Sequence, residues 1–223
     1  MISNIYLDIG NSLTKWKYDE HYFEDATKKF NLNQLPNASR IWTSNVCKKC
    51  NKGKKSNLIV LKSSESYKKL INSYKDPSLL GSDRWFAMIA SYEKSTSKCF
   101  IVIDIGTAVT IDLVDNKSEH QGGVIFPGLE RIRNTFDFPP LASIGDINGL
   151  GQSTEDAWGI GTLYLIANTI NQKNNELKKR FPSAEVFLTG GGYFKVKKYL
   201  NFTHHYHKHL VLDGLEYYVN NVG

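Results

Sequence analysis

The chain has 223 residues, of which 41% are hydrophobic, and a formal net charge of +6 at pH 7. This length suits one large domain or two small ones, and the composition excludes an intrinsically disordered chain. The longest apolar runs, such as Cys99 to Ile103, are far shorter than the roughly 20 residues of a membrane-spanning helix. A strand-like sequence begins within four residues of Met1 and leaves no room for a secretory signal. Together with the odd number of cysteines, this predicts a soluble cytoplasmic protein.

The first half of the chain predicts strands followed by helices. Aromatic and lysine side chains alternate along residues 13–18, as in a half-buried strand, and Gly10-Asn11 favours a turn before them. Asp76-Pro77 stops a helix. The expected elements are strands at 2–9, 13–18, 40–46 and 57–61, then a short helix at 64–74 and a second helix from about Ser82 to about Glu93.

The second half repeats this plan after a linker at 95–98. Ser153 and Asp156 have the spacing of a capping box and predict the start of a helix, which Pro182 ends. The alternation of strands and helices indicates an α/β fold, with halves at 1–95 and 96–223. The expected elements are strands at 99–104, 108–114 and 122–126, one long helix or two shorter ones at 154–180, a strand at 186–189, and then a helix, a strand and a final helix.

Two segments of the chain closely follow the same pattern. Ile5–Ser12 and Ile101–Ala108 are both apolar runs that end in Asp-Ile-Gly and small polar or apolar residues. The long period indicates two related half-molecules and not a solenoid. A carboxylate beside a glycine turn can hold a cation next to backbone N–H groups that bind phosphate, although a single Asp-x-Gly is also a common turn. Two such hairpins that face each other predict a nucleotide clamp.

Small and charged residues near the repeats are candidates for phosphate binding. The hydroxyl groups of Ser12 and Thr107 can donate to phosphate oxygens, and Gly10 and Gly106 allow the ligand to approach the backbone closely. Lys15 can neutralise phosphate charge.

Two further glycine-containing segments are candidates. Gly81-Ser82-Asp83-Arg84 begins a predicted helix with Ser82 as its N-cap, where free N–H groups and Arg84 attract an anion and Asp83 adds a carboxylate. The alternative is that Asp83 only complements the helix dipole and that Arg84 is a surface residue. Gly190-Gly191-Gly192 can admit a flat ligand such as adenine, or can be simply a tight turn.

Taken together, these motifs resemble those of the type III pantothenate kinase family, in the superfamily of acetate and sugar kinases, heat-shock chaperone ATPases and actin. The resemblance runs from Asp8 to Gly192, and Ser12 departs from it mildly because many members have Thr there. The matching segments are Asp8-Ile9-Gly10-Asn11-Ser12-Leu13-Thr14-Lys15, Gly81-Ser82-Asp83-Arg84, Asp104-Ile105-Gly106-Thr107-Ala108-Val109-Thr110 and Gly122-Gly123-Val124-Ile125-Phe126-Pro127-Gly128.

The resemblance implies a fold and an activity. The fold would be a duplicated actin-like ATPase, two ribonuclease H-like halves around a central nucleotide cleft. The activity would be ATP-dependent phosphorylation of pantothenate to 4′-phosphopantothenate, the first step of coenzyme A biosynthesis. The cofactors would be ATP, Mg²⁺ and a monovalent cation, K⁺ or NH₄⁺. The enzyme would be a homodimer whose interface helps to form the pantothenate pocket, with no nucleic-acid or membrane partner.

The resemblance also assigns roles to residues. Asp83 would be the catalytic base, Asp104 would bind the monovalent cation, and Asp8 would bind Mg²⁺. Residues expected to bind ATP are Asp8, Ile9, Gly10, Asn11, Ser12, Leu13, Thr14, Lys15, Thr107, Gly190 and Gly191. Residues expected to bind pantothenate are Tyr74, Gly81, Ser82, Asp83, Arg84 and Thr154.

Other functions remain as alternatives. A kinase-fold regulatory protein without catalysis would have no need for Asp83 and Asp104. A nucleic-acid-binding module would use the lysine runs at 48–55, 173–180 and 195–198, which we interpret as one loop and two solvated helix faces. Few aromatic residues lie among these lysines to stack on bases, which argues against this alternative.

Cysteine and histidine residues offer a weaker metal hypothesis. Cys47 and Cys50 have the spacing of zinc ligands, but a structural zinc site needs four ligands. The histidines at 204–209 are expected to lie on a solvated face.

Overall fold

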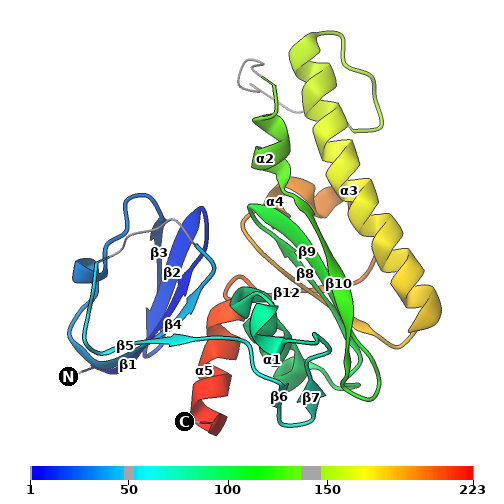
Figure 1. The fold of residues 1–223 in the computed structure, drawn as a ribbon. Helices are drawn as coiled ribbons and strands as arrows, with labels where there is room; N and C mark the ends of the chain where they lie inside the picture. Colours follow the sequence, from blue (N-terminus) through cyan, green and yellow to red (C-terminus); the bar gives the residue numbers. More distant parts are fainter. Residues whose placement is uncertain (1, 48–52, 137–146, 223) are drawn as a thin grey trace.

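Two five-stranded sheets with the same strand order form the frame of the molecule (Figure 1). The structure is a computed structural model, and it describes residues 2–47, 53–136 and 147–222. The first sheet has the order β3-β2-β1-β4-β5 and the second has the order β10-β9-β8-β11-β12. In both, three antiparallel strands are followed by two that run parallel to the first strand of the half. The repeat predicted from sequence is therefore also a repeat of topology.

Most elements lie close to the predicted ranges, although a strand at His21–Ala26 and a short helix at Leu129–Arg133 were not predicted. The strands of the first sheet are β1 (Ile2–Ile9), β2 (Leu13–Tyr18), β3 (His21–Ala26), β4 (Ala38–Asn45) and β5 (Leu58–Leu61). Those of the second sheet are β8 (Phe100–Ile105), β9 (Ala108–Val114), β10 (His120–Pro127), β11 (Glu185–Thr189) and β12 (His205–Tyr206). The α-helices are α1 (Ser82–Lys94), α2 (Leu129–Arg133), α3 (Thr154–Arg180), α4 (Tyr193–Val196) and α5 (Leu210–Val222).

Helices α1 and α5 pack against each other between the two sheets (Figure 1). Helix α5 contacts β1 and β4, and α1 contacts β8 and β9. Trp85 and Phe86 of α1 are fully buried in a core that also contains Phe100 and Phe187 of the second sheet. Gly214 of α5 lies directly against the backbone carbonyl of Phe86, so a side chain there would separate the helices. This shared layer joins the two halves.

The outer face of each sheet has its own cover. A loop with Phe30, Leu32 and Leu35 covers the first sheet, and α3 covers the second. Helix α3 is a single helix, and the Ser153 hydroxyl caps it by accepting the N–H of Asp156, as predicted. It projects well beyond the sheet (Figure 1). No helix within the described residues is long and apolar enough to cross a membrane.

The predicted helix at 64–74 is wrong. The segment is a small hairpin of β6 (Ser66–Tyr67) and β7 (Leu70–Ile71), with Lys68 in the left-handed region at φ 53°. Tyr67 and Leu70 both lie in the core, and the Ile71 N–H donates to the Ser118 carbonyl of the second half. These long-range contacts outweigh the local helical pattern.

The start of α1 also differs from its prediction. Gly81, and not Ser82, is the N-cap, and no side chain caps the helix. The Ser82 hydroxyl instead lies 2.9 Å from the Ser44 hydroxyl of β4, which fixes the start of the helix to the first sheet.

Candidate functional site

A cavity of about 490 Å³ lies between the two repeated hairpins. Helix α1 and the loop after β11 complete its wall. The residues that line it are Asp8, Gly10, Asn11, Ser12, Leu13, Lys15, Val46, Asp83, Asp104, Ile105, Gly106, Thr107, Ala108, Thr110, Leu129, Glu130, Arg131, Asn134, Gly190, Gly191, Gly192 and Lys195. One cavity therefore receives groups from both halves of the chain.

The turns of the two hairpins have matching backbone hydrogen bonds. The Gly10 N–H donates to the Leu13 carbonyl, and the Gly106 N–H donates to the Ala108 carbonyl. The hydroxyl oxygens of Ser12 and Thr107 lie 2.7 Å apart, so the two turns touch at the cavity. Small side chains and exposed backbone at such turns suit a bound phosphate.

Three carboxylates meet in the cavity, and their environment raises their pKa values. Burial, together with the charges of Asp83 and Asp104, raises the pKa of Asp8 to about 7. Burial and the nearby Asp83 likewise raise the pKa of Asp104 to about 6. Burial also raises the pKa of Asp83, although the Arg84 N–H donates to its carboxylate. Lys15 of β2 lies opposite Asp8 of β1, and its positive charge offsets part of this repulsion.

The oxygen atoms around Asp8 and Asp104 are suited to bind a cation. The Oδ1 atom of Asp8 is buried and accepts no hydrogen bond, an arrangement that costs free energy unless a cation or proton is bound. Gly190, at φ 93°, places its backbone against Asp104 and the Ile105 carbonyl, where no Cβ would fit. Carboxylate and carbonyl oxygens are the ligands of hard cations such as Mg²⁺ and K⁺.

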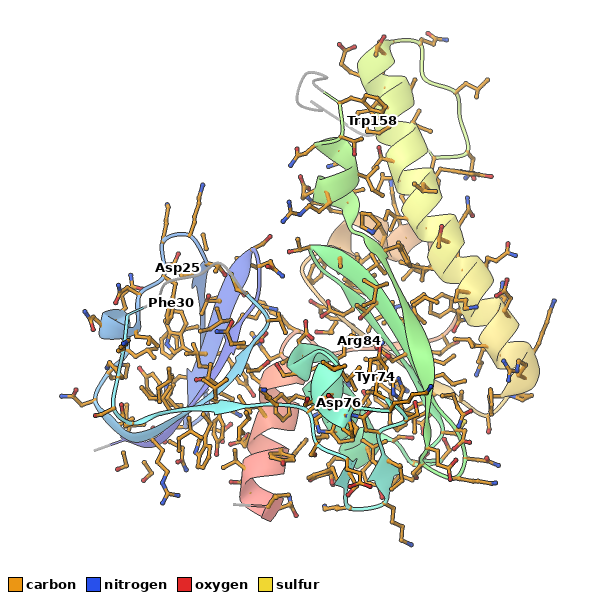
Figure 2. The ribbon with its side chains drawn as sticks, viewed as in Figure 1. Asp25, Phe30, Tyr74, Asp76, Arg84 and Trp158 are labelled. Atoms are coloured by element: carbon orange, nitrogen blue, oxygen red, sulfur yellow. The ribbon has the colours of Figure 1, made fainter. Side chains whose placement is uncertain are left out.

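Arg84 lies behind the cavity and does not line it. It is 7% exposed and forms a bidentate ion pair with Asp112 of β9, so it is not a surface residue. Its third partner is the hydroxyl of Tyr74, which accepts from Nη1 at 3.0 Å. Figure 2 shows Arg84 and Tyr74 next to each other beside α1.

The predicted ATP-binding residues mostly line the cavity. Two of them, Ile9 and Thr14, have buried side chains, and Thr14 hydrogen-bonds to Thr27. The residues that do line it are Asp8, Gly10, Asn11, Ser12, Leu13, Lys15, Thr107, Gly190 and Gly191.

The predicted pantothenate-binding residues do not form one group. Asp83 lines the cavity, whereas Tyr74, Gly81, Ser82 and Arg84 do not. Thr154 begins α3, in the same turn as Trp158, which Figure 2 shows at the end of the helix far from Arg84 and Tyr74.

Several cavity residues were not predicted from the sequence. Glu130 and Arg131 belong to α2, a short helix that directly follows the glycine-rich segment ending at Gly128. Lys195 lines the cavity and forms an ion pair with Glu130. The lysine run at 195–198 is therefore not only a solvated helix face. Asp112, the buried partner of Arg84, and His120, which contacts Asp112, were also missed.

The zinc hypothesis gains no support within the described part of the chain. Cys47 is disulfide-bonded, so its sulfur is not a free thiolate ligand, and no group of three or more His, Cys, Asp or Glu residues there is arranged as a zinc site. Cys50 and the lysines at 48–52 lie outside the described residues.

Comparison with protein families identifies relatives of this chain. A sequence profile of the type III pantothenate kinase family matches residues 4–175. A type III pantothenate kinase from Phocaeicola vulgatus is 32% identical over 232 residues, covering 95% of this chain and 96% of that protein. Another from Bacteroides fragilis strain YCH46 is 33% identical over 156 residues, covering 68% of this chain. That alignment spans 64% of the relative, slightly less than two thirds of its length.

Solved structures show the same fold. A Campylobacter jejuni protein described as a Baf family transcriptional activator has a TM-score of 0.65 at 24% identity, with 97% of both chains covered. A Sinorhizobium meliloti protein described as a 2-dehydro-3-deoxygalactonokinase has a TM-score of 0.59 at 11% identity, covering 98% of this chain and 96% of that one. The predicted α/β fold with two duplicated halves is confirmed, whereas the division at residues 95 and 96 stays a prediction.

Proposed function

The chain belongs to the type III pantothenate kinase family, and we propose that it transfers the γ-phosphoryl group of ATP to the primary hydroxyl of pantothenate. The product would be 4′-phosphopantothenate. The observation that carries this proposal is the convergence of Asp8, Asp83 and Asp104 with Lys15 in one cavity lined by two phosphate-type turns. Phosphoryl transfer depends mainly on alignment and on charge stabilisation, and this cavity supplies both.

The nucleotide would bind between the hairpins. The turns at Gly10–Leu13 and Gly106–Ala108 would hold the phosphates, with Lys15 opposing their charge. Gly190–Gly192 would allow the adenine ring to lie against the backbone, because the space beside the Cα of Gly191 is open, with no atom within 4 Å of where a Cβ would lie. When bound, Mg²⁺ near Asp8 and K⁺ or NH₄⁺ near Asp104 would offset the charge of the triphosphate.

Asp83 would act as the base. It lies in the first turn of α1, on the cavity wall between the two hairpins. As an ionised carboxylate it would accept the proton of the pantothenate hydroxyl and orient that oxygen toward the γ-phosphorus. A positioned base contributes about 10²–10⁴ in rate.

The active unit would be a homodimer. Thr154, a predicted contact of pantothenate, lies at the projecting end of α3, so it would reach a pocket only in a second copy. Tyr164 and Leu165 of α3 are 54% and 53% exposed and offer an apolar face for that copy.

The Leu165→Glu variant should be monomeric by light scattering and should bind pantothenate more weakly, whereas Asn175→Glu on the exposed later part of α3 should remain dimeric.

The compartment proposed for this reaction is the cytoplasm. The odd total of three cysteines suits a reducing compartment, as does the buried free Cys99, although Cys47 is disulfide-bonded.

The decisive experiment is a coupled ADP-release assay with and without pantothenate and K⁺. Pantothenate-dependent ADP release supports the proposal, and its absence at saturating ATP would refute it. A regulatory protein would show no turnover. A nucleic-acid-binding module would instead bind oligonucleotides with an affinity that falls steeply with salt.

A further inference from the structure

A buried polar cluster lies directly behind Asp83. Arg84 donates from Nε to Asp112 at 2.9 Å and from Nη2 to the other oxygen of the same carboxylate. His120 Nε2 lies 2.9 Å from Asp112 Oδ1. Asp112 is 1% exposed and His120 is fully buried, so water does not compete for these bonds. A bidentate guanidinium–carboxylate pair fixes orientation as well as distance.

The cluster joins two elements that carry different parts of the proposed reaction. Arg84 follows Asp83 in the first turn of α1, which comes from the first half of the chain. Asp112 belongs to β9, the strand that leaves the Thr107 turn in the second half. The ion pair therefore links the carboxylate on α1 to the hairpin that lines the nucleotide cavity, across the junction of the halves.

The backbone around the Arg84–Asp112 ion pair leaves room for it. Gly123 of β10 lies opposite Asp112, and a Cβ on Gly123 would clash with the Asp112 carboxylate, the Ile111 carbonyl and Arg84 Nη2. The register of β9 and β10 shifts between His120 and Gly123, and Gly122 has a φ of 88°. A bulge of this kind re-aims side chains, and here it turns a buried histidine toward Asp112.

The remaining faces of the cluster are also occupied. The ring of His120 stacks on Tyr74 with centroids 5.9 Å apart, and its Nδ1 lies 3.4 Å from the Ser73 hydroxyl. Burial acts to raise the pKa of Asp112, but hydrogen bonds from His120 and Arg84 outweigh it and lower the pKa. Asp112 thus remains ionised and holds Arg84 firmly.

We propose that Asp112 and His120 are positioning residues that act through Arg84 to align Asp83 with the nucleotide. Asp112 fixes the guanidinium, and His120 fixes the Asp112 carboxylate. The inference rests on the proposed function, in which Asp83 receives the proton of the acceptor alcohol. A displacement of about 1 Å in such a group costs about 10²-fold in rate.

The test compares kcat and KM in matched variants. Asp112→Asn keeps the shape of the side chain but removes its charge, and we expect kcat to fall about 10²-fold while the KM for ATP stays close to that of the wild type. The control is Asp115→Asn: Asp115 is also buried, but its carboxylate accepts from Lys117, Glu119 and Gln121 in a turn away from the cavity. Its kcat should match the wild type. Equal kcat values for the two variants would overturn the proposal.

Two further variants test the positioning role in case Asp112→Asn does not fold. Gly123→Ala removes no polar group, but its Cβ would press on the Asp112 carboxylate and the Ile111 carbonyl as well as on the Arg84 guanidinium, and it should lower kcat in the same way as Asp112→Asn. His120→Gln retains an N–H donor for Asp112 and should keep most of the kcat that His120→Leu loses. A Gln variant no better than the Leu variant would remove His120 from the role. Thermal unfolding of each variant separates these effects from instability.

The outcome also distinguishes this inference from the proposed function. A wild-type chain that phosphorylates another alcohol but not pantothenate would refute the substrate, and the same variants would then be compared on that alcohol. A wild-type chain that transfers phosphate to no alcohol would overturn both proposals. A wild type active on pantothenate, with an Asp112→Asn variant equally active, would overturn only the positioning role.

Discussion

The hydroxyl oxygens of Ser12 and Thr107 lie 2.7 Å apart, although 95 residues separate them in the chain. Each belongs to the turn of a hairpin whose first strand ends in Asp-Ile-Gly. Contact between the turns brings Asp8 and Asp104 to one cavity, which neither half could form alone. The charges of these carboxylates act on each other, as the raised pKa of Asp8 indicates. The duplication thus produces a site at the junction of its two copies.

Replacement of Asp83 by Asn should abolish most of the activity without unfolding the protein. Asn keeps the size of the side chain but cannot accept a proton, so kcat should fall about 10²–10⁴-fold. Steady-state ADP release measures the loss, and circular dichroism checks the fold. An Asn variant with near-wild-type turnover would exclude Asp83 as the base.

Replacement of Asp104 by Asn should weaken the dependence on a monovalent cation. Asp104 lies near Asp83 in the cavity, and removal of its charge would take away the carboxylate that we propose attracts the cation. Titration of activity with KCl at saturating ATP should show a half-maximal concentration raised about tenfold or more, equivalent to at least about 1.4 kcal/mol. Unchanged potassium dependence would contradict the assignment.

Glu185 predicts a defined pH dependence of stability. Its Oε1 atom accepts hydrogen bonds from Ser95, Thr96 and Ser97 in the segment between α1 and β8. Burial acts to raise the pKa of Glu185, but these donors outweigh it and lower the pKa to about 2. Because the folded pKa lies below the unfolded value, the stabilisation is present above about pH 4.5 and is lost as pH falls toward 2.

The Glu185→Gln variant tests this prediction. It should lower the free energy of unfolding by about 1–2 kcal/mol at pH 7, because solvent screens part of the interaction, and the difference from wild type should shrink as pH approaches 2. Urea denaturation at several pH values measures it. Glu176→Gln on the exposed face of α3 is the control and should change little at any pH. A difference that persists unchanged at low pH would argue that packing, and not charge, is responsible.

Lys17 should stabilise the contact between β2 and α5. It is 4% exposed, and its Nζ atom lies 2.6 Å from Glu216 and 3.2 Å from the Tyr22 hydroxyl. The Lys17→Met variant leaves Glu216 without its partner, so unfolding should become easier by about 1–3 kcal/mol. Lys173→Met, which removes an exposed pair with Glu176, should have a far smaller effect because water screens that pair. Equal effects in the two variants, measured by urea denaturation, would show that burial of Lys17 gives no added stability.

Local sequence patterns were sufficient to predict most of the strands and helices and the phosphate-type turns. The strand pattern of β2, the Asp-Ile-Gly repeat and the Ser153 cap depend on residues close in sequence, and the structure has each of these elements in place, although Lys17 of β2 is buried and not on a solvated face. The candidates Asp8, Asp83 and Asp104 were therefore identifiable from short sequence motifs. Segments whose structure depends on contacts between residues far apart in the chain could not be predicted in this way. Tyr67 and Leu70 resembled part of a helix, yet their burial in the core and the bond from Ile71 to Ser118 make them a hairpin.

The amino-acid sequence by itself determined the duplicated strand-turn-strand units, their acidic ends and the family of the chain, because these are properties of short contiguous segments. Only the tertiary structure decided that Arg84 is buried and paired with Asp112, which His120 also contacts, that Lys195 lies in the cavity, and that Thr154 is remote from it. The physical reason is that a bidentate ion pair or a cavity wall requires atoms from several elements at fixed distances. Those distances follow from the packing of both sheets around α1 and α5, which no local pattern encodes.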